Sequence, residues 1–238
     1  MHPFFIQKIM DIRKRPKTHL IKEDFDELEY IFNNNEAKDF LRVSERPRNN
    51  QDYTPTNVGK MMPAIMYPDL KQWYKERMGV KDGFYGGQIA YLETPLPPHA
   101  DVLWHIEDHF TKRMPSIARY ILLETDAEDT CSTFTFNQFV IPEKYNGFEF
   151  DSVVDETTVT GFEDKPIGHP DGLEHLKAHV AGLGLSVQQD IKTEIGKIYT
   201  WPCNQIHSGE SFVRNKATYK KHMTIFTPIE HYQEWLEW

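Results

Sequence analysis

Short runs of aromatic and β-branched residues dominate the chain from Asp82 onward. These runs are GGQIAYLE, ARYILLET, STFTFNQFVI, GKIYTW and KKHMTIFT, and glycines, prolines and acidic clusters separate them. Short strands with irregular connections are typical of a sandwich or barrel, whereas a doubly wound α/β fold would alternate strands with helices. The 15 Phe and 11 Tyr residues favour the same packing. We therefore expect a mainly β fold with flanking helices.

The first 80 residues predict helices. Between Asp24 and Asn34, Phe25, Leu28 and Ile31 recur at helical spacing, and acidic residues stand early, as a helix N-terminus prefers. The stretch PDLKQWYKERMGV, residues 68–80, begins with proline and has glycine near its end, which indicates a second short helix.

This pattern predicts two parts, a helix-bearing segment of residues 1–80 packed on a β domain of residues 81–238. Residues 42–56 are polar with two prolines and are expected to form a loop, and residues 102–115 a helix beside the sheet. We interpret residues 143–190, acidic at first, as an insertion in the β domain. Connections this long inside a compact domain usually belong to a lid or a binding loop.

Composition and charge exclude several classes of protein. The 238 residues are 39% hydrophobic and 26% charged, and the formal net charge is -9. Nucleic acid is not the expected partner, because a non-specific grip on phosphates needs a basic surface. Cys131 and Cys203 are too few for a disulfide framework, which suggests a reducing compartment. The N-terminus has the pattern of neither a signal peptide nor a membrane span, so we expect a cytoplasmic location.

The stretch QIAYLETPLPPHAD ends in His99 and Asp101 with one residue between them. On an extended backbone the two side chains point to the same face, because side chains alternate with a period of two. They could therefore be adjacent ligands of one metal ion. His207, in KIYTWPCNQIHSGE, is the best candidate for a third ligand. It would complete the two-histidine, one-carboxylate site of non-haem Fe(II) oxygenases.

Each of these residues also has an ordinary structural explanation. Two further His-x-acid pairs occur at residues 105–107 and 169–171, so such a pair is weak evidence by itself. His99 and Asp101 could be a surface histidine and a turn-capping carboxylate. His207 could be a strand-end histidine satisfied by backbone hydrogen bonds.

A zinc hydrolase is a further alternative. His105 and His109 are four residues apart, as are His175 and His179, which puts each pair on one face of a helix. HIEDH lacks the glutamate directly after the first histidine that marks HExxH zinc hydrolases. Amphipathic helix faces therefore explain the two pairs better.

Four stretches between residues 84 and 228 resemble, in the same order, parts of the Fe(II)- and 2-oxoglutarate-dependent dioxygenases: IAYLETPLPPHAD, ARYILLETDAEDTCSTFTF, GKIYTWPCNQIHSG and KKHMTIF. The first resembles the strand and turn that end in the metal-binding pair, and the second resembles the following hairpin. The third resembles the strand of the distal histidine, and the fourth resembles the last strand. The likeness is to the prolyl-hydroxylase-like branch of that family. It implies a double-stranded β-helix, a jelly roll related to the cupins.

The resemblance implies that His99, Asp101 and His207 are the iron ligands and the catalytic centre. It also implies 2-oxoglutarate and dioxygen as co-substrates. The distal carboxylate of 2-oxoglutarate would need a cation at the bottom of the barrel, commonly an arginine on the last strand. This chain offers Arg214, Lys216, Lys220 and Lys221 instead.

The period of two favours one of these cations. If the inner row of the last strand matches that of the family, Lys220 faces inward with Thr224, and Lys221 points outward. We therefore expect Lys220 to bind 2-oxoglutarate with help from Thr224, and Arg214 is the main rival. The alternative is a solvated basic strand edge. Tyr91 matches a family tyrosine whose hydroxyl reaches the co-substrate, although it could also be a core aromatic.

The predicted activity follows from this ligand set. The resemblance implies a hydroxylase that couples oxidative decarboxylation of 2-oxoglutarate to succinate with oxidation of a substrate C–H bond. The substrate would be peptidyl, as the resembled branch suggests, or a small molecule. The alternative is a cupin-like binding or structural jelly roll without oxygenase activity, because fold does not establish function.

Overall fold

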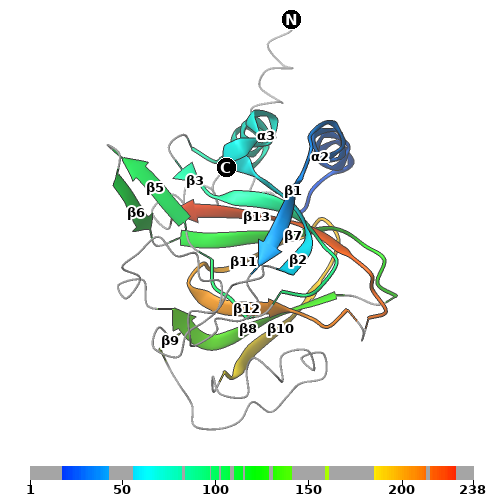
Figure 1. The fold of residues 1–238 in the computed structure, drawn as a ribbon. Coiled ribbons are helices and arrows are strands. Elements are labelled where there is room, and N and C mark those ends of the chain that lie inside the picture. The colour runs from blue at the N-terminus through cyan, green and yellow to red at the C-terminus, as the bar shows by residue number, and fades with distance from the viewer. Residues whose placement is uncertain are drawn as a thin grey trace, which may run out of the picture.

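The computed structural model describes residues 18–42, 56–81, 84–96, 98–101, 103–107, 110–114, 116–128, 131–140, 159–160, 185–212 and 215–228. Strands predominate among them, and helices lie on one side of the molecule (Figure 1). Every ladder between named strands is antiparallel. No helix in the described part of the chain is both long and apolar enough to span a membrane.

The larger sheet forms the middle layer of the molecule (Figure 1). Its order is β1 (Lys38–Arg42), β2 (Thr56–Pro63), β4 (Gly87–Leu92), β13 (Lys220–Pro228), β7 (Ser116–Thr125) and β11 (Ile198–Pro202). The apolar runs predicted the last four of these strands. The first two come from the lead segment and add to the same sheet, beside β4.

The smaller sheet lies below the larger one in Figure 1. Its order is β10 (Val187–Thr193), β8 (Cys131–Val140) and β12 (Gln205–Gly209), and β9 (Val159–Thr160) pairs with β8. An isolated antiparallel bridge between His99 and His207 adds residues 98–101 to the other side of β12. Between β4 and β13 the chain thus passes repeatedly from one sheet to the other. This topology is the double-stranded β-helix, so the predicted fold class is confirmed.

A third sheet corrects one sequence-based expectation. It contains β3 (Phe84–Tyr85), β5 (Leu103–Glu107) and β6 (Phe110–Met114). The helix predicted over residues 102–115 is therefore wrong, because the helical spacing of apolar residues there loses to backbone pairing between two adjacent strands.

Two helices cover the outer face of the larger sheet, as predicted (Figure 1). They are α2 (Lys22–Asn34) and α3 (Pro68–Met78), and a single 3-10 turn (Ala64–Met66) precedes α3. The Asp24 carboxylate accepts a hydrogen bond from the Ile21 N–H at the start of α2. Pro68 opens α3, and Gly79 closes it with a left-handed φ of 62°.

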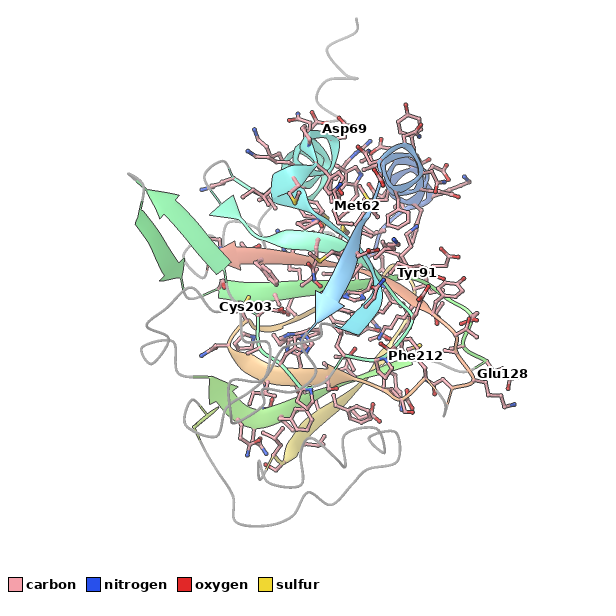
Figure 2. All side chains as sticks on the ribbon, in the orientation of Figure 1. Met62, Asp69, Tyr91, Glu128, Cys203 and Phe212 are labelled. Carbon is pink, nitrogen blue, oxygen red and sulfur yellow. The ribbon has the colours of Figure 1, made fainter. Side chains whose placement is uncertain are left out.

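Apolar packing joins these helices to the sheet. Leu28 and Ile31 of α2 and Leu70 and Trp73 of α3 belong to one buried cluster. Figure 2 shows Met62 of β2 in this layer, between helices and sheet. From the sheet the cluster takes Ile89, Ile121, Met223 and Ile225. Burying one such side chain stabilises the fold by roughly 1.5–3 kcal/mol.

The chain before α2 also pairs with the larger sheet. Ile198 donates its N–H to the Thr18 carbonyl at 2.9 Å, and Leu20 donates to the Gly196 carbonyl at 2.8 Å. The bridge His19–Lys197 lies between these bonds. The chain's own backbone therefore covers the outer edge of β11 at its first residue, Ile198.

Two predicted connections fall mostly outside the described residues. Of the loop expected at 42–56, residues 43–55 lie outside, and β2 begins at Thr56. Of the insertion expected at 143–190, residues 143–158 and 161–184 lie outside. Its last residues belong to β10, a strand of the smaller sheet.

Gly59 in β2 provides a test of this sheet. Its φ is 144°, and an added Cβ would lie 2.0 Å from the Tyr91 carbonyl oxygen of β4. We expect Gly59→Ala to lower the free energy of unfolding by at least about 1–3 kcal/mol in urea denaturation, because backbone strain alone costs that much. Gly209→Ala is the matched control, since its Cβ would meet nothing within 4 Å. Equal stability of both variants would contradict the described β2–β4 pairing.

Candidate metal centre and adjoining cavity

Backbone pairing brings together residues that are far apart in the sequence. His99 donates its N–H to the His207 carbonyl at 3.0 Å, and His207 donates to the His99 carbonyl at 2.9 Å. Asp101 then donates its N–H to the Cys203 carbonyl at 2.7 Å. These three bonds hold residues 99–101 against the turn and strand that lead to His207.

The side chains of His99, Asp101 and His207 converge on one point. Each offers a ligand atom, and these atoms all lie within 4.8 Å of one another. The His207 Nε2 is 3.5 Å from the Asp101 Oδ2, and the two imidazole centroids are 4.3 Å apart. Both histidines are buried, and Asp101 is partly exposed. Two imidazoles and a carboxylate so arranged could hold one metal ion.

One hydrogen bond determines which nitrogen of His207 is available. The Nδ1 lies 3.1 Å from the Gln205 carbonyl oxygen. A carbonyl only accepts hydrogen bonds, so Nδ1 carries the proton and the neutral ring keeps its lone pair on Nε2. That nitrogen is the one that faces Asp101. The buried indole of Trp201 packs beside the ring, with centroids 5.1 Å apart.

A cavity between the two sheets adjoins this cluster. His99, Asp101 and His207 line it, together with polar side chains of the surrounding strands. These polar side chains are those of Gln88, Tyr120, Thr133, Lys220, His222 and Thr224. Leu92, Pro95, Leu96 and Phe212 add an apolar side to the cavity.

The cluster and Lys220 lie toward different ends of the sheets. Asp101 bonds to Cys203, and the Cys203 N–H bonds to Ser116 at the start of β7. Lys220, by contrast, pairs with Thr125 at the end of β7. In Figure 2, Cys203 correspondingly lies toward one end of the sheets, and Phe212 and Glu128 lie toward the other.

Lys220 is buried, although its side chain ends in an ammonium group. Its Nζ lies 5.2 Å from the centroid of the Tyr120 ring. Burial raises the pKa of Tyr120, and the positive charge of Lys220 partly offsets that rise. No carboxylate of the described residues forms an ion pair with Lys220.

Alternation along β13 accounts for which cations face inward. Lys220 and Thr224 are both buried and line the cavity, as predicted, and His222 lies between them on the same face. Lys221 points to the helices instead, with its Nζ 4.0 Å from the centroid of the Phe32 ring. Arg214, the predicted rival, lies outside the described residues.

The structure places Tyr91 away from the cavity, so its predicted contact with a co-substrate is wrong. Tyr91 pairs with Lys221 across β4 and β13, and both face outward. Its ring stacks on Tyr219 with centroids 5.1 Å apart. The physical reason is the strand period: Gln88 and Leu92 point into the cavity, and Tyr91 lies an odd number of residues from both, so it points out.

The alternative zinc pairs have less support. His105 lies in the strand β5, so the helical spacing that would join it to residue 109 is absent. Residues 109, 175 and 179 lie outside the described part of the chain.

Comparison with known proteins finds only distant similarity, to solved structures. No family model matches the chain, and no curated protein matches it. The α-ketoglutarate-dependent epimerase SnoN from nogalamycin biosynthesis is 10% identical, with 95% of this chain and 84% of SnoN covered and a TM-score of 0.42. The carbocyclase SnoK from the same biosynthesis is 8% identical, with coverages of 88% and 76% and a TM-score of 0.42.

A third solved structure shows a similarly distant likeness. HygX from Streptomyces hygroscopicus, with iron bound, is 10% identical, with 94% of this chain and 86% of HygX covered and a TM-score of 0.37. At such identities, and with TM-scores below 0.5, these structures assign neither a reaction nor a substrate to this chain.

Sequence reasoning missed Tyr120 and Thr133 as cavity residues, whereas it placed His222 in the inner row of the last strand, where the structure has it. Tyr120 pairs with Thr224 across β7 and β13, a register that no local pattern indicates. Thr133 lies on β8, whose place beside β12 no local pattern indicates. The carbonyl that accepts the hydrogen bond from the His207 Nδ1 belongs to the backbone of Gln205, so no residue type in the sequence predicts it.

The thiol of Cys203 tests the burial around Asp101. Burial raises the pKa of this thiol, and the Asp101 carboxylate raises it further. We expect the thiol to stay protonated and unreactive toward Ellman's reagent at neutral pH in the Cys131→Ser protein, where no other cysteine remains. In denaturant it should react at once. Rapid reaction of the native protein would contradict the closed packing between β11 and β12.

Proposed function

We propose that this protein is a non-haem Fe(II)- and 2-oxoglutarate-dependent oxygenase, and that its reaction is a hydroxylation. The observation that carries the proposal is a His-Asp-His cluster beside a cavity that contains a buried lysine without a carboxylate partner among the described residues. A buried ammonium is costly unless an anion pairs with it. A metal chelator with a distal carboxylate satisfies both features.

The residues present fit the proposed metal ion. His99, Asp101 and His207 would hold Fe(II), because two imidazoles and one carboxylate on one side leave the other positions open. The His207 Nδ1–H is already held by a carbonyl, so the other ring nitrogen is available. Bound iron with 2-oxoglutarate and dioxygen would supply oxidative decarboxylation to succinate and carbon dioxide, coupled to oxidation of a substrate C–H bond.

The protein contributes binding and placement. Lys220 would neutralise the distal carboxylate of 2-oxoglutarate, and Thr224, Thr133 and Tyr120 would donate hydroxyl hydrogen bonds to it. Lysine is a point charge rather than a fork, so neighbouring hydroxyls would fix the orientation of the carboxylate. Burial between two sheets excludes water from this end of the cavity.

The substrate would approach from the other end, where Asp101 lies. The last residues of β8 lie on this side, because Phe139 pairs with Gln205, and β10 begins beside Phe136. We propose a peptidyl or small-molecule substrate there. Succinate release across a panel of peptides and small metabolites would identify it.

The first test measures metal and co-substrate binding together. We expect anaerobic Fe(II) plus 2-oxoglutarate to give a weak visible charge-transfer band, and His99→Ala to abolish it because a ligand is lost. The alternative, a non-catalytic jelly-roll binding protein, predicts no band in either protein. A band that persists in His99→Ala would contradict the assigned ligand set.

The second test separates the two neighbouring lysines. Lys220→Met should weaken 2-oxoglutarate binding about 10- to 100-fold, because a hydrogen bond to a charged group contributes about 1.5–3 kcal/mol. Lys221→Met is the matched control, since that side chain lies on the opposite face, over Phe32. Titration of the band with 2-oxoglutarate measures both. Equal losses in both variants would remove Lys220 from the proposed role.

A further inference from the structure

The strand that carries His207 pairs irregularly with its neighbour. Gln205 pairs with Phe139 and His207 with Thr135, so residues 136–138 of β8 lie opposite Ile206 alone. On its other side, β8 is also irregular, because the register to β10 shifts between Val187 and Gln189. A bulge of this kind interrupts the ladder and leaves backbone groups to be satisfied in other ways.

The side chain of Gln205 occupies this bulge. Its Nε2 donates a hydrogen bond of 2.8 Å to the Phe136 carbonyl and another to the Gln188 Oε1. Gln205 is buried, with 4% of its surface exposed. One amide group therefore ties β12 to both β8 and β10, at the place where the regular ladder fails.

The main-chain carbonyl of the same residue accepts the hydrogen bond from the His207 Nδ1. We propose that Gln205 is a positioning residue for His207. Its amide locks the bulge, the locked bulge aims the Gln205 carbonyl, and the carbonyl keeps the imidazole in the Nδ1–H form with Nε2 facing Asp101. The effect of Gln205 on activity rests on the proposed metal-dependent function. Its effect on the orientation of the His207 ring does not.

A buried imidazole without this restraint has two neutral forms. With the proton on Nε2, the nitrogen that faces Asp101 would have no lone pair for a metal. Partners that orient a metal-binding histidine typically change metal affinity 10- to 100-fold when they are lost. The Gln205 side chain would affect metal affinity only indirectly, because the backbone carbonyl is still present when the side chain is replaced.

Gln138 supplies a matched control. It lies in the same bulge, is fully buried, and its Oε1 accepts a hydrogen bond from the Ser186 N–H at 3.0 Å. Gln138→Met and Gln205→Met each remove one buried amide from one bulge and replace it with an apolar side chain of similar length. Of the two, Gln205 is the residue whose main-chain carbonyl lies within hydrogen-bond distance of the imidazole.

The first measurement uses metal-free protein. Long-range proton–nitrogen NMR spectra of histidine-labelled protein, at alkaline pH where the ring is neutral, report which nitrogen of His207 is protonated. We expect Nδ1–H in the unmodified protein and in Gln138→Met, and a mixture of both forms in Gln205→Met. A His207 signal unchanged in Gln205→Met would overturn the proposal.

The second measurement is the dissociation constant for Co(II), followed by absorption. We expect Gln205→Met to weaken binding about 10-fold, at the lower end of that range, and Gln138→Met to leave it unchanged. Equal weakening in both variants would show a merely structural role and would also overturn the proposal. If the unmodified protein binds no Co(II) while the tautomer still shifts in Gln205→Met, the positioning role stands and the proposed function fails.

A third variant covers the case in which Gln205→Met does not fold. Gln188 is exposed and accepts one of the two hydrogen bonds from the Gln205 amide, so Gln188→Ala should fold. It should populate the second tautomer to a smaller, measurable extent. Spectra identical to those of the unmodified protein would count against the locked bulge.

Discussion

The pair of hydrogen bonds between the backbones of His99 and His207 is the interaction on which the proposed site depends. The two bonds, of 3.0 and 2.9 Å, attach residues 98–101 to the smaller sheet beside β12. They also bring two imidazoles within 4.3 Å of each other across more than a hundred residues of sequence. The backbone bond from Asp101 to Cys203 continues the same alignment and places the carboxylate beside the two imidazoles.

The cavity combines two environments that a single sheet could not supply. Its polar side takes residues from the inner rows of β13, β7, β8 and β4, and its apolar side includes Leu92, Leu96 and Phe212. Alternation within each strand makes this possible, because the residues between the inner rows support the helices on the outside. Met223 packs in the helix-covered cluster, whereas His222 and Thr224 on either side of it line the cavity.

Local patterns in the sequence predicted much of the fold and the three clustered residues. Apolar runs located β4, β7, β8, β11 and β13, and helical spacing located α2 and α3. The period of two also chose Lys220 over Lys221 as the inward cation. The rule was not applied to Tyr91, whose direction was taken from family likeness and not from the register of β4. Thr133 and Gln205 could not be found this way, since their roles arise from pairing between distant strands and from an irregular ladder.

The edge strands β11 and β10 of the two sheets differ in what lies beside them. Unpaired strand borders invite association with other molecules, and natural proteins cover them or make them charged. Residues 18–20 bond to residues 196–198 and so cover the start of β11, the border strand of the larger sheet, with the protein's own backbone. The border strand β10 instead exposes Gln188, Gln189 and Asp190, a polar row unsuited to stacking against a second copy. Three residues just ahead of α2 thus make the outward backbone groups at the start of β11 unavailable to another strand.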